Sequence, residues 1–179
     1  NTDFYDLVVH SSDRLLLSDS ESTDLMVSNS LTIQSSILTD NGNTLTVRGP
    51  VYNSGKHLSA AGNGGILLSG TEAFSISGAG TYGHVELDNE EGVQLKDPIT
   101  ITNSLTLNQG VLRLNEHMLT LNGPLLGSGF SENKMIETSG AASNGGFRYQ
   151  IPSGSESHII PVGVPLKYTP VEVNVSANP

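Results

Sequence analysis

The stretch ITITNSLTLNQGVLRLNEHMLTLNG, residues Ile99–Gly123, repeats one short apolar pattern four times. Each repeat is a triplet with apolar side chains at its first and third positions and a polar side chain between them. The four triplets are Ile99–Ile101, Leu105–Leu107, Leu112–Leu114 and Leu119–Leu121. Alternate side chains of a β-strand point to opposite faces. The stretch therefore predicts four short strands, each with one buried and one exposed face.

The triplets also recur at a constant distance along the chain. Their first residues lie 20 positions apart in four pairs: Leu25 and Leu45, Leu31 and Val51, Ile99 and Leu119, and Leu105 and Leu125. A triplet that returns at this interval is typical of a chain wound into stacked coils. We therefore expect an all-β fold, a right-handed parallel β-solenoid (β-helix) of about six short turns. A β-sandwich is the rival fold, but its strands recur at longer intervals than these triplets do.

Composition and charge exclude several classes of function. The chain has 8 basic and 18 acidic residues, and its net charge of -10 disfavours nucleic-acid binding. It contains no cysteine, which removes disulfides, thiolate catalysis and cysteine metal sites. No apolar run is long enough to span a membrane. The chain starts at Asn1 and stops within a strand pattern, so we expect it to be a piece of a longer protein.

Two parts of the chain are copies of one unit. Residues 25–55 align with residues 99–129 without a gap at an offset of 74, with 12 of 31 positions identical. The identical positions include turn residues such as Asn41 with Asn115 and Gly49 with Gly123. Farther upstream the offset becomes 78, because the first copy carries an acidic insertion at residues 18–24. We therefore define two repeat units, residues 4–55 and 82–129.

The C-terminal part departs from the coil pattern. It holds five of the eight prolines, and its strands at residues 146–151 and 171–175 are longer than the triplets. Proline removes a ladder donor and favours edges and turns. We therefore expect a β-solenoid over residues 1–140, followed by a β-rich segment over 141–179 that serves as a cap or as the start of a following module.

Two segments carry a resemblance to known proteins. The segment HVELDNEEGVQLKDPITITNSLTLNQGVLRLNEHMLTLNG, residues 84–123, resembles the β-helical repeats of very large surface and secreted proteins of Bacteroidetes-type bacteria. The segment GGFRYQIPSGSESHIIPVGVPLKYTPVEV, residues 145–173, resembles the part that often follows such repeats. The resemblance implies export, attachment outside the cell and a role as adhesin, stalk or filament. The first repeat unit departs from this pattern at Asp40, where the second has Leu114, and in its acidic insertion.

Acidic turns are the first candidates for a binding site. Asp19, Glu21 and Asp24 in the insertion could bind Ca²⁺, which prefers several oxygen ligands, but they lack the spacing and glycine of a calcium loop. The run Asp88–Glu91 occupies the equivalent corner of the second unit, with Asp97 nearby. We interpret both runs as solvated turns and assign no metal site and no cofactor.

Catalytic constellations are also weak in the sequence. A hydrolase of the Ser-His-Asp type needs converging partners, and the chain has no Gly-x-Ser-x-Gly motif. We interpret the five histidines as surface polar residues: His10, His57, His84, His117 and His158. The segment Gly62–Gly65 is not a phosphate-binding loop, because no Lys-Ser or Lys-Thr pair follows it.

A β-helix polysaccharide lyase or glycosidase is the enzyme alternative. Such a site would need paired carboxylates and a base, and sugar sites also favour aromatic platforms. The chain has no Trp, and Tyr52, Tyr82, Tyr149 and Tyr168 show no common alignment. Its basic residues are spread at one per turn or fewer: Arg14, Arg48, Lys56, Lys96, Arg113, Lys134, Arg148 and Lys167. We therefore expect no enzyme activity and assign no catalytic residue.

Ice binding is a third class, which requires flat ladders of outward threonines. Thr100 and Thr120 are 20 residues apart and should stack. The sequence spacing predicts Met26 and Thr46 as further members of the same ladder, which would break it. We expect instead a structural or adhesive module at the cell surface, a stiff spacer or display rod. Its expected partners are other modules of the same chain or neighbouring copies, and surface glycans, but neither nucleic acid nor membrane.

Overall fold

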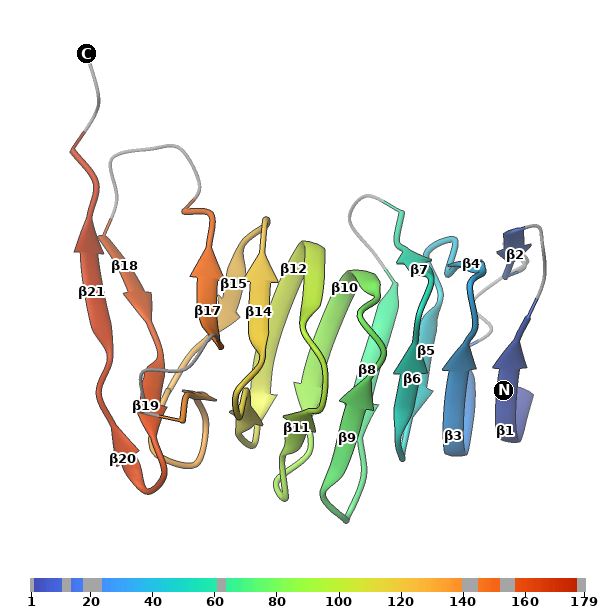
Figure 1. Cartoon of the computed structure of the whole chain (residues 1–179), viewed down its shortest axis with the longest axis horizontal. Coiled ribbons are helices and arrows are strands. Elements are labelled where there is room, and N and C mark those ends of the chain that lie inside the picture. Colours follow the sequence, from blue (N-terminus) through green and yellow to red (C-terminus); the bar gives the residue numbers. More distant parts are fainter. Residues whose placement is uncertain are drawn as a thin grey trace.

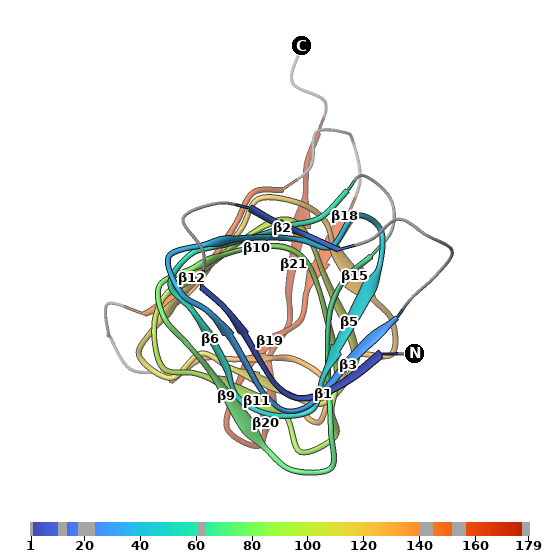
Figure 2. The ribbon, with the colours of Figure 1, turned by 90° about the vertical axis from the view of Figure 1, so that its right-hand side faces the viewer.

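The computed structural model describes residues 2–10, 14–17, 24–60, 64–139, 145–151 and 157–176. These residues form strands and turns without any helix, and successive turns of chain stack along one axis (Figure 1). Seen along that axis, the turns superimpose around a common ring (Figure 2). The predicted β-solenoid of about six turns is therefore confirmed.

Each turn contributes strands to three faces, which we name A, B and C. Strands on one face pair in parallel with the strands of the turns before and after. Face A consists of the first half of β1 (Thr2–Val9), the first half of β3 (Leu25–Ile33), β5 (Thr44–Val47), β8 (Gly65–Ser69), the second half of β10 (Thr81–Asp88), the second half of β12 (Ile99–Gln109) and β15 (Leu125–Gly127).

Faces B and C are built in the same way. Face B consists of the second halves of β1 and β3, then β6 (Val51–Asn53), β9 (Phe74–Ser77), β11 (Val93–Leu95), β13 (Leu112–Arg113), β16 (Ile136–Glu137) and β19 (Val162–Val164). Face C consists of β2 (Arg14–Leu16), β4 (Ile37–Thr39), β7 (Lys56–Leu58), the first halves of β10 and β12, β14 (Met118–Leu121) and β17 (Gly146–Tyr149).

The register confirms the spacing of 20 residues. All four predicted pairs are direct neighbours on adjacent turns: Leu25 with Leu45, Leu31 with Val51, Ile99 with Leu119, and Leu105 with Leu125. The first member of each triplet points inward, and Leu31, Leu45, Leu105 and Leu119 are fully buried. Stacked aliphatic side chains of this kind each contribute about 1.5–3 kcal/mol through burial. The core is therefore a continuous apolar column enclosed by three ladders of backbone hydrogen bonds.

The two repeat units have the same local structure. Asn41 and Asn115 both adopt a left-handed backbone, with φ of 52° and 53°. Asparagine tolerates this conformation, so it suits the tight turn that precedes the next strand. A Cβ at Gly49 would collide with the carbonyl oxygen of Asn29, and one at Gly123 with that of Asn103. The identical turn residues are therefore explained by identical corners.

Corresponding residues of the two units nevertheless lie on different faces. Leu25 begins the aligned part of the first unit on face A, whereas its counterpart Ile99 lies on face C. Leu31 lies on face B and its counterpart Leu105 on face A. At 20 residues per turn, an offset of 74 residues is about three and two-thirds turns. The second unit is therefore displaced by one face relative to the first.

Parallel pairing continues beyond residue 140. Strand β17 pairs with β14 on face C, and β19 pairs with β16 on face B. The chain then leaves the coil: β20 (Lys167–Tyr168) pairs antiparallel with β19, and β18 (Ser157–Ile160) forms a separate antiparallel pair with β21 (Val171–Asn174). This β-rich part covers the end of the stack that carries the C-terminus, and β1 forms the other end (Figure 1). The boundary at residues 140/141 stays a prediction, because residues 140–144 lie outside the described part.

Candidate functional site

Asp40 and His57 form a buried polar pair inside the coil. Asp40 follows β4 at the corner between faces C and A, and His57 lies in β7, one turn along the stack. At most 1% of either side chain is exposed, and His57 Nε2 lies 3.1 Å from Asp40 Oδ2. The prediction that His57 is a surface residue is therefore wrong. Its burial follows from its place in β7, where it stacks in register with the buried Leu38.

Hydrogen bonds fix the pair from both sides. The backbone N–H of Gly42 donates to Asp40 Oδ1 at 3.0 Å, and the Ser59 hydroxyl donates to the same carboxylate. The backbone N–H of Gly83 donates to His57 Nδ1 at 3.3 Å. Because Nδ1 accepts a hydrogen bond, the proton of the neutral imidazole lies on Nε2 and faces Asp40.

The surroundings keep Asp40 ionised. Burial by itself would raise the pKa of Asp40, because a carboxylate loses hydration inside the protein. The hydrogen bonds that the carboxylate accepts from His57, Ser59 and Gly42 outweigh burial and lower the pKa below its usual value. Asp40 therefore remains a carboxylate at neutral pH.

The presence of Asp, His and Ser side chains in one place does not make a hydrolytic site. A nucleophilic serine must donate its proton to the histidine, and the acid must hold the other ring nitrogen. Here Ser59 donates to Asp40, and both nitrogens of His57 are occupied. The pair is also closed off from solvent. Its chemistry is that of a structural core contact.

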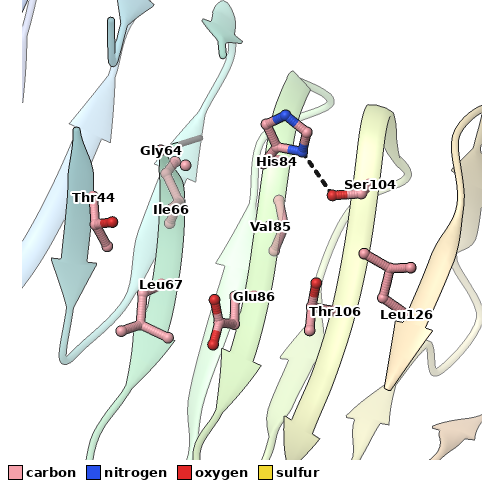
Figure 3. Close-up of a pocket in the computed structure, with 11 residues that line it drawn as sticks. Thr44, Gly64, Ile66, Leu67, His84, Val85, Glu86, Ser104, Thr106 and Leu126 are labelled. Carbon is pink, nitrogen blue, oxygen red and sulfur yellow. Dashed lines mark hydrogen bonds between the residues drawn. The ribbon is translucent and has the colours of Figure 1, made fainter. Parts of the chain in front are cut away.

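An open groove lies on face A next to this pair (Figure 3). It has a volume of about 330 Å³ and crosses β5, β8, β10, β12 and β15. One lining residue is His84, whose backbone N–H donates to the Ser59 hydroxyl at 2.9 Å and thereby connects the groove to the Asp40 pair. The other side chains along it are Thr44, Ile66, Leu67, Val85, Glu86, Ser104, Thr106 and Leu126.

His84 and Ser104 are the pair in the groove that most resembles a histidine base with a serine nucleophile. His84 Nδ1 lies 2.6 Å from Ser104 Oγ (Figure 3). The Asn103 amide nitrogen lies 3.5 Å from His84 Nε2. Since an amide N–H can only donate, Nε2 accepts and Nδ1 carries the proton that it donates to Ser104. Ser104 is therefore not activated as a nucleophile.

The first repeat unit contains the same corner without a histidine. At the equivalent position Asp6 accepts hydrogen bonds from Asn29 and Ser30, the counterparts of Asn103 and Ser104. The pairing of β1 with β3 has the same irregularity before Asp6 as the pairing of β10 with β12 has before His84. Because either Asp or His can occupy this position, we interpret its side chain as one that holds the bend of the long strand, β1 in the first unit and β10 in the second.

Among the described residues, Glu86 is the only carboxylate that lines the groove. Burial and the negative charge of Asp88 raise the pKa of Glu86 above its usual value. The Asn108 amide donates a hydrogen bond to Glu86 Oε1. A single carboxylate held by an amide does not provide the acid and base pair that glycoside hydrolysis requires.

The predicted acidic sites are only partly visible. Asp19 and Glu21 lie outside the described residues, and Asp24 is exposed. In the run Asp88–Glu91, both glutamates are exposed, but Asn89 is buried and bonds to the carbonyl of Glu72. Asp97 accepts the backbone N–H of Gly78 at 2.8 Å and stabilises a turn. Within the described residues, no three His, Asp or Glu side chains gather at metal-binding distance.

The remaining histidines are dispersed. His10 is exposed, and His84, His117 and His158 are half-buried on separate turns or in the C-terminal part. Together with His57, they do not converge on a common point in the described structure. No signal in the sequence distinguished His57 except its closeness to Asp40 on the following turn, which becomes visible once β4 and β7 are paired.

Two other hollows of the described surface contain too few acids for a lyase. One hollow of about 450 Å³ includes Glu90, Arg113 and Lys134, and another of about 370 Å³ includes Arg48, Glu72 and Lys96. Each combines one carboxylate with two basic residues. Arg113 is further engaged by Glu137, at 3.8 Å, and by the Glu91 carbonyl.

The threonine ladder differs from the prediction. Thr100 stacks between Thr81 and Thr120 on face C, whereas Met26 and Thr46 pair with each other on face A. The predicted stacking of Thr100 with Thr120 is therefore confirmed, whereas the placement of Met26 and Thr46 in the same ladder is wrong, because corresponding residues of the two repeat units lie on different faces. Lys56 precedes Thr81 and Arg148 follows Thr120, so the ladder is a single file of three threonines with a cation at each end.

Comparison with protein-family models, with curated proteins and with solved structures finds no match for this chain. In the described residues no helix is long and apolar enough to cross a membrane.

Proposed function

We propose that this chain is a structural and adhesive module of a long extracellular bacterial surface protein, in which it acts as a stiff spacer or display rod. The observation that carries the proposal is the parallel register, which runs through every turn from β1 to β17. A continuous ladder of backbone hydrogen bonds around an apolar column resists bending. At about 4.8 Å per turn, the rod is on the order of 30 Å long.

The polar groups of the interior support the same proposal. Asp40, His57 and Asn53 are fully buried, and each is engaged by groups from a neighbouring turn. Asp6 and His84 occupy equivalent corners and form equivalent hydrogen bonds, so a structural role is sufficient to explain the polar residue at this corner. We therefore propose that the chain has no catalytic activity of its own, and the lyase alternative lacks a groove with two carboxylates and a base among the hollows described above.

The test is a distance distribution. We place the chain between two fluorescently labelled domains and record single-molecule energy transfer. A stiff spacer gives one narrow distance population that does not change with ionic strength. A Gly/Ser linker of equal length, as the matched control, gives a broad distribution. A broad distribution for this chain under native conditions would refute the spacer function.

A further inference from the structure

Charged residues are unequally distributed over the three faces. The strands of face A contain Asp3, Glu86 and Asp88 and neither lysine nor arginine. The strands of face C show the opposite pattern: they contain three basic residues and neither aspartate nor glutamate. In a chain with 18 acidic and 8 basic residues, a sheet face without any acid is unexpected.

The basic residues of face C lie in one continuous file. Register partners run from turn to turn in the order Arg14, Ile37, Lys56, Thr81, Thr100, Thr120 and Arg148. Arg14, Lys56 and Arg148 are exposed, and the three threonines between them are half-buried. Within the described residues, neither Lys56 nor Arg148 forms an ion pair. Two acids that precede these strands, Asp97 and Glu116, lie in corner turns.

The shape of this file suits a linear partner. Seven strands at about 4.8 Å spacing give a length of about 29 Å, and strands of three or four residues give a width of about 10–13 Å. This area is well below the roughly 800 Å² per partner of a stable protein interface. A polymer chain lying along the file would contact the cations and the threonine hydroxyls in succession.

The chemistry of the face distinguishes between linear polyanions. Single-stranded nucleic acids bind on exposed aromatic platforms. The aromatic side chains of these strands pack toward the core instead: Tyr82 is 1% exposed, and Phe147 and Tyr149 lie against the buried cluster. Hydroxyl groups and separate cations without aromatic rings fit the hydroxyls and spaced carboxylates of an acidic polysaccharide.

We propose that face C, along the file from Arg14 to Arg148, binds a linear acidic polysaccharide. Arg14, Lys56 and Arg148 contact its carboxylates, and the hydroxyls of Thr81, Thr100 and Thr120 contact its hydroxyl groups. The proposal goes beyond the spacer function, because a rod can be stiff whether or not face C binds a polymer.

The experiment is a titration of the purified chain with alginate, a linear polyuronate, in 50 mM NaCl. We expect saturable binding that weakens about tenfold or more in 200 mM NaCl, since binding at three cations releases counterions. The variant Lys56→Glu/Arg148→Glu lowers the affinity at least tenfold. The milder Lys56→Gln/Arg148→Gln lowers it less, and it serves as the decisive variant if the first one is less stable in a thermal melt.

The matched control is Lys134→Glu/Lys167→Glu, which makes the same change in net charge away from face C. It should retain alginate affinity within about twofold, because general repulsion between exposed charges is screened by salt. Equal loss of affinity in the control, absence of alginate binding, equal binding of neutral dextran, or tighter binding of oligothymidine would each overturn the proposal. Each of these results leaves the distance measurement on the spacer unaffected.

Discussion

The two repeat units fold alike, but they differ in the side chain at one corner, which follows β4 in the first unit and β13 in the second. The first unit has Asp40, buried against His57, whereas the second has the fully buried Leu114. Both residues begin the same turn: Asn43 N donates to the Asp40 carbonyl at 3.0 Å, and His117 N donates to the Leu114 carbonyl at 2.9 Å. The backbone of this corner therefore tolerates either an apolar side chain or a compensated charge. The following variants test that conclusion, in order of expected effect.

The largest effect is expected from breaking the polar pair on one side only. His57→Leu leaves the Asp40 carboxylate buried without its partner, and we expect a loss of about 3–5 kcal/mol in unfolding free energy. The double variant Asp40→Leu/His57→Leu makes the first unit resemble the second, and it should recover most of that loss. Urea unfolding followed by circular dichroism measures both. A double variant that is no more stable than the single one would contradict the equivalence of the corners.

The reverse substitution, Leu114→Asp, places a carboxylate where no histidine faces it. We expect a loss similar to or larger than that of His57→Leu, because an unpaired buried charge has no compensation. The same urea experiment tests this expectation. Wild-type stability for Leu114→Asp would mean that the corner of the second unit is open to water.

A smaller effect, of equal size in the two units, is expected at the corresponding glycines Gly49 and Gly123. Gly49→Ala and Gly123→Ala each push a Cβ against the carbonyl of Asn29 or Asn103, and overpacking of this kind costs about 1–3 kcal/mol. Thermal melts of the two variants should shift by similar amounts. A shift in only one of them would show that the corners are not equivalent.

The polar pair also makes stability depend on pH. The folded-state pKa of Asp40 is lower than that of an unfolded aspartate. Its contribution is therefore complete above about pH 4, the unfolded value, and is lost as the pH falls through the lower folded value. We expect the melting temperature of the wild type to fall more steeply below about pH 4 than that of Asp40→Leu/His57→Leu. Parallel curves for the two proteins would contradict an ionised Asp40.

The smallest effect is expected at the outer corner of the long strands. Asp6→His and His84→Asp exchange the residues of two equivalent positions, and each new side chain meets the same Ser and Asn neighbours. We expect changes within about 0.5 kcal/mol, as is usual at surface positions. A large loss for His84→Asp alone would indicate a function of His84 beyond holding the bend.

Much of the fold could be predicted because the period of two and the spacing of 20 residues report directly on strand pairing. Leu25, Leu31, Ile99 and Leu105 and their partners were correctly paired from spacing alone. Asn41 and Asn115 were also correctly placed in turns, because few residues tolerate a left-handed backbone. Both signals are local or periodic, so they can be recognised in the sequence without knowledge of the tertiary structure.

The displacement of the second unit by one face could not be read from the triplets. The three faces use the same apolar residues in the same alternation, so a triplet does not reveal which face it occupies. Thr81 was missed as the third member of the ladder with Thr100 and Thr120 for this reason. The Asp40–His57 pair was missed because both residues are polar in isolation and become a buried pair only when β4 and β7 stack.

The displacement of the second unit by one face can be tested most directly with a disulfide placed just before that unit begins. The chain has no cysteine, so introduced pairs can be oxidised without interference. Thr81 is the register neighbour of Lys56 on face C, and neighbouring parallel strands are close enough for a disulfide. If the units were aligned on the same face, Thr81 would instead lie beside Leu67 on face A. We expect rapid intramolecular oxidation of Lys56→Cys/Thr81→Cys and none of Leu67→Cys/Thr81→Cys, and the opposite pattern would show that the two units begin on the same face.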